Sequence, residues 1–127
     1  MKPKLKDAIA WQQAELLMQP ALIRVIDNIS KHLERSSWQG DYREEQFPYP
    51  TYKLVLKLGD RTLEIDLWEL CYQVCFLEYH LTHAKPQTQE VDIDTSLIAE
   101  NGEVNWQRLD EKSKTVVQTA FKNLGQE

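Results

Sequence analysis

The sequence predicts an α+β fold in a single domain that spans residues 1–127. Three patterns predict it: a helical spacing of apolar residues near the N-terminal end, two adjoining segments of alternating apolar and polar residues, and a second helical spacing towards the C-terminal end. A chain of 127 residues and 14.9 kDa has the size of one compact domain. Apolar residues make up 42% and charged residues 28%, which is typical of a folded globular protein rather than a disordered one.

A long helix is expected over residues 1–36. Its apolar residues recur at intervals of three and four, as they do along one face of an α-helix. They are Leu22, Val25, Ile26, Ile29 and Leu33. Pro20 lies inside the same segment. Because proline lacks an N–H and clashes with the preceding turn, we expect either a kink or two abutting helices at this point.

The segment after this helix contains an expected edge strand and an irregular connection. Trp38, Gly40 and Tyr42 alternate with other residues, which indicates the start of an edge strand. The prolines of Phe47-Pro48-Tyr49-Pro50 remove backbone donors and restrict the residues before them. We therefore expect an extended, polyproline-like connection to the next strand.

The clearest local pattern is a β-hairpin with strands at about 52–58 and 61–67. Apolar and polar residues alternate in both segments, and Gly59-Asp60 between them favours a tight turn. Each strand then has one apolar and one charged face, so the hairpin covers a core on one side only. The expected cross-strand ion pairs join Lys53 and Lys57 to Glu64 and Asp66.

Two further helices complete the expected fold, at about 67–83 and about 110–124. Asp66 is expected to cap the first of them, with Glu69 completing an acidic capping box. Between the helices we expect a loop over 84–90 and then short strands. The strand residues are Val91 to Asp94, Leu97-Ile98 and Val104.

Cys71, Cys75, His80 and His83 form the densest group of potential metal ligands in the chain. All four fall on one expected helix, whereas a tetrahedral zinc site usually gathers its ligands from two elements. We therefore interpret both cysteines as small buried apolar residues and assign no metal site and no cofactor. The sequence has no Gly-x-Ser-x-Gly motif and only four scattered glycines, so we assign no catalytic residue and expect a protein that is not an enzyme.

The net charge of −5 is unevenly distributed along the chain. Residues 37–105 carry the excess of acidic groups, whereas both ends are slightly basic. The one cluster of cations, Lys2, Lys4 and Lys6, is too small for a phosphate-binding face, so a nucleic-acid partner is not expected. No apolar stretch has the length of a membrane span or a signal-peptide core, and we expect a cytoplasmic protein that does not bind membranes.

Aromatic residues indicate a protein-binding surface. Tyr and Trp are enriched where proteins bind one another, and an edge strand accepts a further strand from a partner. We assign partner binding to Trp38, Tyr42, Phe47, Tyr49 and Tyr52. The alternative, which the sequence leaves open, is that this aromatic segment folds back onto its own hairpin.

The order of the expected elements and the acidic charge resemble those of small acidic binding chaperones, including the type III secretion chaperone class. Glu69-Leu70-Cys71-Tyr72 after a hairpin and Trp11-Gln12-Gln13-Ala14 are also similar to small cyanobacterial accessory proteins such as carboxysome-assembly chaperones. These resemblances imply an acidic dimer that holds an extended segment of a partner, and they assign no site residue.

The expected function is therefore that of a non-enzymatic adaptor or assembly chaperone. It is expected to form a homo-oligomer, most simply a homodimer, and to hold a short segment of a partner protein. Two alternatives stay open: a small metal- or ligand-binding regulatory domain, and a structural subunit of a larger complex.

Overall fold

The computed structural model describes residues 2–46, 50–77, 79 and 88–123, and one hydrophobic core joins its elements. Helix α1 (Ala8–Glu34) packs against both α2 (Leu67–Cys75) and α3 (Trp106–Asn123). A three-stranded antiparallel sheet follows α1 in the chain, with β2 (Gln39–Glu45), β3 (Thr51–Leu58) and β4 (Arg61–Asp66) in that order across the sheet. The predicted α+β fold class is confirmed.

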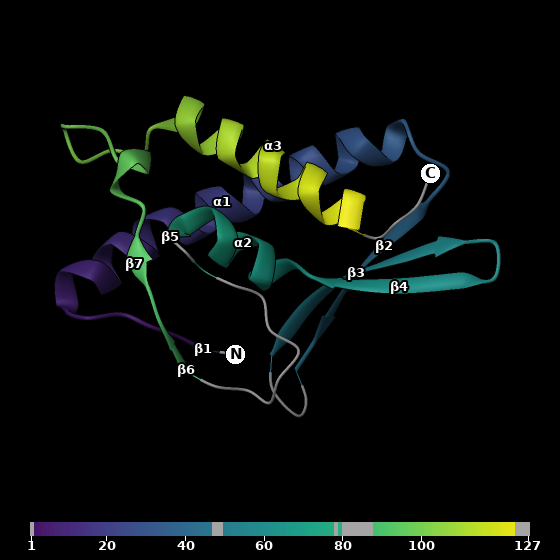
Figure 1. Ribbon diagram of the computed structural model, residues 1–127, viewed down its shortest axis with the longest axis horizontal. Helices are drawn as coiled ribbons and strands as arrows, with labels where there is room; N and C mark the ends of the chain where they lie inside the picture. Colours follow the sequence, from purple (N-terminus) through teal and green to yellow (C-terminus); the bar gives the residue numbers. More distant parts are fainter. Residues whose placement is uncertain (1, 47–49, 78, 80–87, 124–127) are drawn as a thin grey trace.

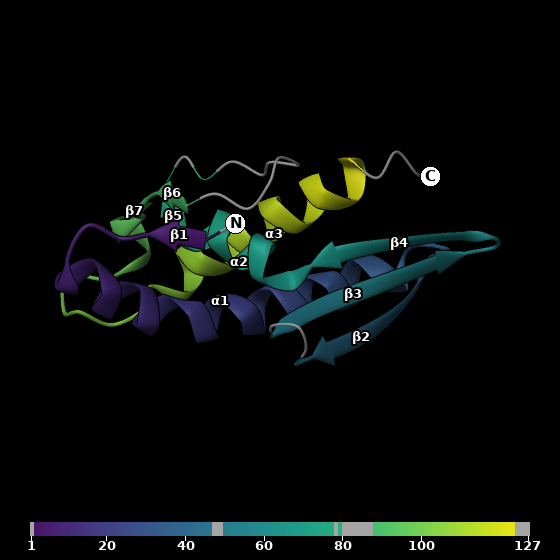
Figure 2. The ribbon, with the colours of Figure 1, turned by 90° about the horizontal axis from the view of Figure 1, so that it is seen from below.

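Two small sheets lie at the end of the molecule opposite the β3–β4 turn (Figures 1 and 2). Strand β1 (Lys2–Lys4) pairs in parallel with β6 (Thr88–Glu90), and β5 (Phe76–Leu77) pairs antiparallel with β7 (Asp92–Ile93). A single 3₁₀ turn, η1 (Thr95–Leu97), links β7 to the segment before α3. Within the described part of the chain, no helix combines the length and the apolar character that crossing a membrane requires.

Helix α1 begins later than expected and runs without interruption to Glu34. Residues 2–4 form β1 instead, and the Asp7 carboxylate caps the helix by accepting a hydrogen bond from the Ala10 N–H at 2.8 Å. The helix continues through Pro20, so the expectation of two abutting helices is wrong. Proline deprives only the Leu16 carbonyl of a donor, and Leu16 is exposed, so water reaches that side of the helix.

The hairpin and the edge strand are confirmed. Leu58 pairs with Arg61 around the two-residue turn, where Gly59 has a φ of +60°, and β2 pairs with the other side of β3. Lys53 lies opposite Asp66 and its Nζ is 3.4 Å from a Glu64 carboxylate oxygen, as expected. Lys57 was expected to face an acid and instead lies opposite Thr62.

Helix α2 is shorter than expected, because it ends at Cys75 and not near residue 83. Phe76 is extended, with a φ of −113° and a ψ of 146°, and it pairs with Ile93 in β7. The helix therefore ends where the chain gains a strand partner. Asp66 caps the helix as expected, accepting hydrogen bonds from the N–H groups of Trp68 at 2.9 Å and of Glu69 at 3.4 Å.

Glu69 does not close the expected capping box. Its Oε2 accepts a hydrogen bond from the Tyr79 hydroxyl at 2.6 Å, so this carboxylate holds the chain beyond α2 against the helix. His80 and His83 lie outside the described residues.

The segment before α3 differs from the expected succession of strands. Thr88–Glu90 is a strand rather than part of a loop, and Leu97 belongs to η1 rather than to a strand. Ile98 and Val104 form one antiparallel bridge around a turn in which Gly102 has a φ of +86°. The strand expected at Val104 is thus a single bridge to Ile98.

Helix α3 begins at Trp106, before the expected start near Asp110. The Asn105 side chain accepts a hydrogen bond from the Arg108 N–H at 3.1 Å, and asparagine is a strong N-cap. Val117 and Phe121 are buried as the helical spacing predicted. The expected end of the helix at residue 124 lies outside the described residues.

Candidate functional site

The residues assigned to partner binding lie in different environments. Trp38 is only 3% exposed, with the Arg61 guanidinium 5.2 Å from its ring centre, so its side chain has little surface to offer a partner. Tyr42 and Tyr52 are half-buried on neighbouring strands, and their ring centres are 6.4 Å apart. Phe47 and Tyr49 lie outside the described residues. The structure thus brings together Tyr42 and Tyr52 and moves Trp38 into the core.

The strand that carries Tyr42 is an open edge of the sheet. All residues of β2 are exposed except Tyr42, which is half-buried. Within the described part of the chain, β2 pairs with β3 alone, and Figure 2 shows it as an outermost strand. An edge of this kind presents backbone donors and acceptors that have no partner in the sheet.

The register shows which backbone groups of β2 are free. A two-residue turn makes Leu58 and Arg61 a hydrogen-bonded pair, and such pairs alternate with non-bonded pairs along an antiparallel ladder. Val55 therefore directs its N–H and C=O towards β2, where it faces Asp41. The alternation assigns the outward-pointing backbone groups of β2 to three residues: Gly40, Tyr42 and Glu44.

The two faces of β2 differ in character. On the helix side, a Cβ at Gly40 would lie 2.7 Å from the Leu33 Cδ1, so the absence of a side chain lets α1 approach the strand closely. On the outer side, Arg43 forms an ion pair with Asp41 at 3.1 Å, and both side chains are more than half exposed. The strand therefore has a close contact with α1 on one face and exposed charges on the other.

The opposite edge of the sheet, β4, is less accessible to an added strand than β2 is. Its outward-pointing residues by the same alternation are Thr62, Glu64 and Asp66. Glu64 contacts Lys53 within the sheet, and the Asp66 side chain caps α2, which starts at the next residue. A strand added beside β4 would meet this junction, whereas β2 has no helix starting directly at its end.

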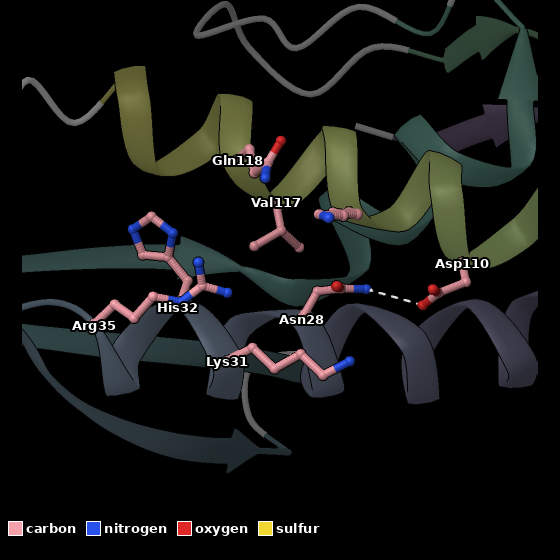
Figure 3. A pocket seen from close by; sticks show the side chains of 8 residues that line it. Asn28, Lys31, His32, Arg35, Asp110, Val117 and Gln118 are labelled. Atoms are coloured by element: carbon pink, nitrogen blue, oxygen red, sulfur yellow. Dashed lines mark hydrogen bonds between the residues drawn. The ribbon is translucent and has the colours of Figure 1, made fainter.

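A groove of about 520 Å³ between α1 and α3 is the second candidate site (Figure 3). Its lining residues are Asn28, Lys31, His32, Arg35, Asp110, Lys114, Val117 and Gln118. Three of these are cations and one is an acid, which contrasts with the net charge of −5 of the whole chain. The groove therefore favours an anionic ligand.

The floor of this groove is fixed by contacts between the two helices. The Asn28 amide, which is buried, donates to the Arg24 carbonyl at 2.9 Å and to Asp110 at 3.4 Å. The His32 ring stacks on Phe121 with ring centres 4.1 Å apart. Sequence reasoning missed this site because it depends on which face of α1 meets α3. The one sequence feature that could have indicated the site is Asn28, a polar residue beside the apolar stripe.

The cysteines do not form an accessible reactive site. Cys71 and Cys75 are buried and not disulfide-bonded. Burial raises the pKa of both thiols, that of Cys75 to about 12, so they are protonated at neutral pH. Among the residues that the structure describes, no three His, Cys, Asp or Glu side chains gather as metal ligands.

Comparison of the chain with protein-family models, curated proteins and solved structures finds no match. The resemblance to binding chaperones therefore stays a prediction, and β2 and the groove between α1 and α3 are the two features of the structure that indicate a function.

Proposed function

We propose that this protein is a non-enzymatic adaptor or assembly chaperone of the cytoplasm that holds an extended segment of a partner protein against β2. The observation that supports the proposal is an exposed edge strand of seven residues whose outer backbone groups are unpaired within the described sheet. A partner's strand satisfies these groups by continuing the antiparallel or parallel ladder. Each net backbone hydrogen bond contributes about 1 kcal/mol, so several bonds together give useful affinity.

Side chains beside the edge give the site its selectivity. On the helix side, the half-buried Tyr42 ring is carried by the edge strand itself, and the half-buried Tyr52 ring on β3 lies behind it, with the two ring centres 6.4 Å apart. Aromatic rings in such positions contribute strongly to protein binding. Asp41, Glu44 and Glu45 outnumber the one cation, Arg43, so the edge disfavours any segment whose acidic side chains face these three directly.

The substitution Glu44→Pro tests this proposal. Proline at this position removes an outward N–H and leaves the bonds between β2 and β3 in place, since edge strands tolerate proline there. The matched control is Thr62→Pro, which removes an outward N–H from β4. The measurement is the set of proteins captured from a native lysate by the unaltered chain and by each variant, with circular dichroism to confirm folding.

The proposal expects that at least one stoichiometric partner is lost with Glu44→Pro and retained with Thr62→Pro. Loss of that partner should recur with Tyr42→Ala, which removes a ring beside the edge. Capture of the same proteins by all of these variants would contradict binding at β2.

The groove between α1 and α3 supports a second candidate function, that of a ligand-binding regulatory domain. Three cations in one groove favour a small anion such as pyrophosphate. We expect pyrophosphate to raise the melting temperature of the unaltered chain and to have no effect on an Arg35→Ala/Lys114→Ala variant. Lys122→Ala, a cation on α3 outside the groove, is the control that should keep the response. An equal response in all three proteins would remove this candidate.

A further inference from the structure

Strand β2 is complementary to itself when two copies run antiparallel. If a two-fold axis passes through Tyr42, then Asp41 of each copy lies directly opposite Arg43 of the other. Opposite charges on directly facing residues stabilise antiparallel strands. The Asp41–Arg43 ion pair seen within one strand is exposed, so both side chains are free to exchange this contact for one across the axis.

The free backbone groups match in the same register. Tyr42 faces Tyr42 of the second copy, and Gly40 faces Glu44, so the three outward-pointing residues meet only one another. All of them fall in hydrogen-bonded pairs of the new ladder, whereas Asp41 and Arg43 fall in the non-bonded pairs between them. Pairing therefore satisfies the open edge of both sheets and joins them into one.

Neighbouring registers fit less well. An axis at Gly40 places Asp41 opposite Gln39, which removes both ion pairs and shortens the overlap. An axis at Glu44 keeps opposite charges facing each other at Arg43 and Glu45, but it places two Glu44 carboxylates opposite each other and lets only residues 43–45 of β2 overlap. The register centred on Tyr42 uses the full length of β2, forms two opposite-charge pairs and places no two like charges directly opposite each other.

We propose that in the free protein the β2 edge is closed by β2 of a second copy in this register, and that a partner's segment has to displace that copy. The dimer itself needs only the geometry of the strand, whereas its displacement rests on the proposed function. The second copy then protects an edge that would otherwise promote aggregation, and it keeps the site closed until a partner is present.

The first test is the mass in solution, measured by analytical ultracentrifugation over a range of concentrations. We expect the unaltered chain to approach twice 14.9 kDa as its concentration rises. Glu44→Pro should remain monomeric and Thr62→Pro should dimerise like the unaltered chain. A monomer at every concentration would overturn the dimer, and a dimer that persists in Glu44→Pro would assign the contact to another surface and overturn it as well.

Charge reversal tests the register without introducing proline. Arg43→Asp puts two carboxylates opposite each other at two places, so the dissociation constant of the dimer should rise by about tenfold or more. The double variant Asp41→Arg/Arg43→Asp restores opposite charges at both places and should recover the affinity. Failure of the double variant to recover it would contradict this register even if a dimer forms.

Cross-linking identifies the facing residues directly. In a non-bonded antiparallel pair the Cα atoms are about 4.5 Å apart, within the range of a disulfide. A mixture of Asp41→Cys and Arg43→Cys chains should therefore form a disulfide-linked heterodimer under mild oxidation, while either variant alone should not. The native thiols are buried and do not compete. An equal yield from the single variants would exclude the proposed register.

A separate experiment tests whether a partner displaces the second copy. It uses any protein that the unaltered chain captures from the lysate and the Glu44→Pro variant does not. The complex should contain one copy of this chain, and the heterodimer locked by the disulfide should not bind the partner until it is reduced. Binding by the locked dimer would overturn the displacement while leaving the dimer in place. Absence of any such partner contradicts the proposed function, and the ultracentrifugation and cross-linking results then decide the dimer alone.

Discussion

Two aspartate–cation pairs of this protein have similar chemistry and opposite surroundings. Asp41 and Arg43 lie two residues apart on β2, 3.1 Å from each other, with both side chains more than half exposed. Asp94 directly follows β7 and Lys112 lies on α3. The Lys112 Nζ is 2.6 Å from an Asp94 carboxylate oxygen, and the Asp94 side chain is only 10% exposed. The first pair is local and solvated, whereas the second connects two elements through the interior.

Further contacts surround the Asp94 pair. Asp94 also accepts hydrogen bonds from the Ser96 N–H at 3.1 Å and from the Ser96 hydroxyl at 2.6 Å, and the Ser96 oxygen accepts one from Arg108 at 3.2 Å. Removing Asp94 therefore takes away the acceptor shared by the Lys112 ammonium, which is only 25% exposed, and by the Ser96 N–H and hydroxyl. Among the described residues the β2 pair has no comparable network, and both of its side chains are more than half exposed, so they can exchange this contact for another. The same residue types thus fix the fold in one region and remain available for binding in the other.

Of the substitutions that test the difference between the two pairs, Asp94→Ala should lower the free energy of unfolding most. The substitution removes the cap of η1 and leaves the Lys112 ammonium without its partner. We expect the free energy of unfolding to fall by about 3 kcal/mol. Urea denaturation followed by tryptophan fluorescence measures this change. A loss below about 0.5 kcal/mol, the range of an ordinary surface substitution, would show that the pair does not stabilise the fold.

Acid should remove part of the same stabilisation. Burial is the largest single influence on the Asp94 pKa and raises it, but the hydrogen bonds from Lys112 and Ser96 and the charge of Lys112 together outweigh burial and lower the pKa below the usual 3.8. The unfolded chain therefore binds the proton more tightly than the folded one, so this contribution is complete above pH 3.8 and is lost as the pH falls through the folded-state pKa. We expect the stability difference between the unaltered chain and Asp94→Asn to shrink below that pH. A difference that stays constant there would contradict the assignment.

A smaller effect is expected where β2 contacts the helical layer. In Gly40→Ala the new methyl group meets the Leu33 Cδ1 at 2.7 Å, and Leu33 is half-buried and able to shift. We expect a loss of about 1 kcal/mol in urea denaturation. Leu33→Ala removes the closer contact and leaves only that with the buried Leu54 Cδ1 at 3.1 Å, so the two substitutions together should cost less than the sum of their separate effects. Strict additivity would show that this contact does not limit the approach of α1 to β2.

The smallest expected effect on the folded chain is that of Asp41→Ala. Exposed ion pairs contribute little, so the free energy of unfolding of dilute protein should change by less than about 0.5 kcal/mol. The same substitution should weaken dimerisation, because it removes both ion pairs across the axis. Ultracentrifugation and dilute urea denaturation on one sample separate the two effects. A large loss of stability with no change in dimerisation would show that the Asp41–Arg43 pair stabilises the fold and does not take part in binding.

Local patterns in the sequence predicted the parts of the fold that depend on local interactions. The alternation around Gly59-Asp60 and the apolar spacing along α1 are patterns among residues close in the chain, and both elements were found, the helix with a later start than expected. The end of α2 was not predictable in this way, because the apolar spacing continues past Cys75. Pairing of Phe76 with Ile93, far along the chain, ends the helix, and no local pattern reports it.

The candidate site, too, was predictable only where it depends on local patterns in the sequence. The alternation of Trp38, Gly40 and Tyr42 was sufficient to locate the edge strand. The burial of Trp38 was not predictable, since alternation does not tell which face of an edge strand the helices cover. The sequence shows that Asp41 and Arg43 carry opposite charges, but not which backbone groups of β2 point outwards. That follows only from the register of β2 against β3.

We have proposed that β2 is an open edge whose outer backbone groups pair with a second copy or with a partner. Amide hydrogen exchange, measured residue by residue, reports this pairing at each of those groups. In dilute protein, the Asp41 and Arg43 amides should be protected while those of Gly40, Tyr42 and Glu44 exchange quickly. At high concentration or with a bound partner, the last three should become protected too. Rates at Gly40, Tyr42 and Glu44 that respond neither to concentration nor to a partner would contradict the claim.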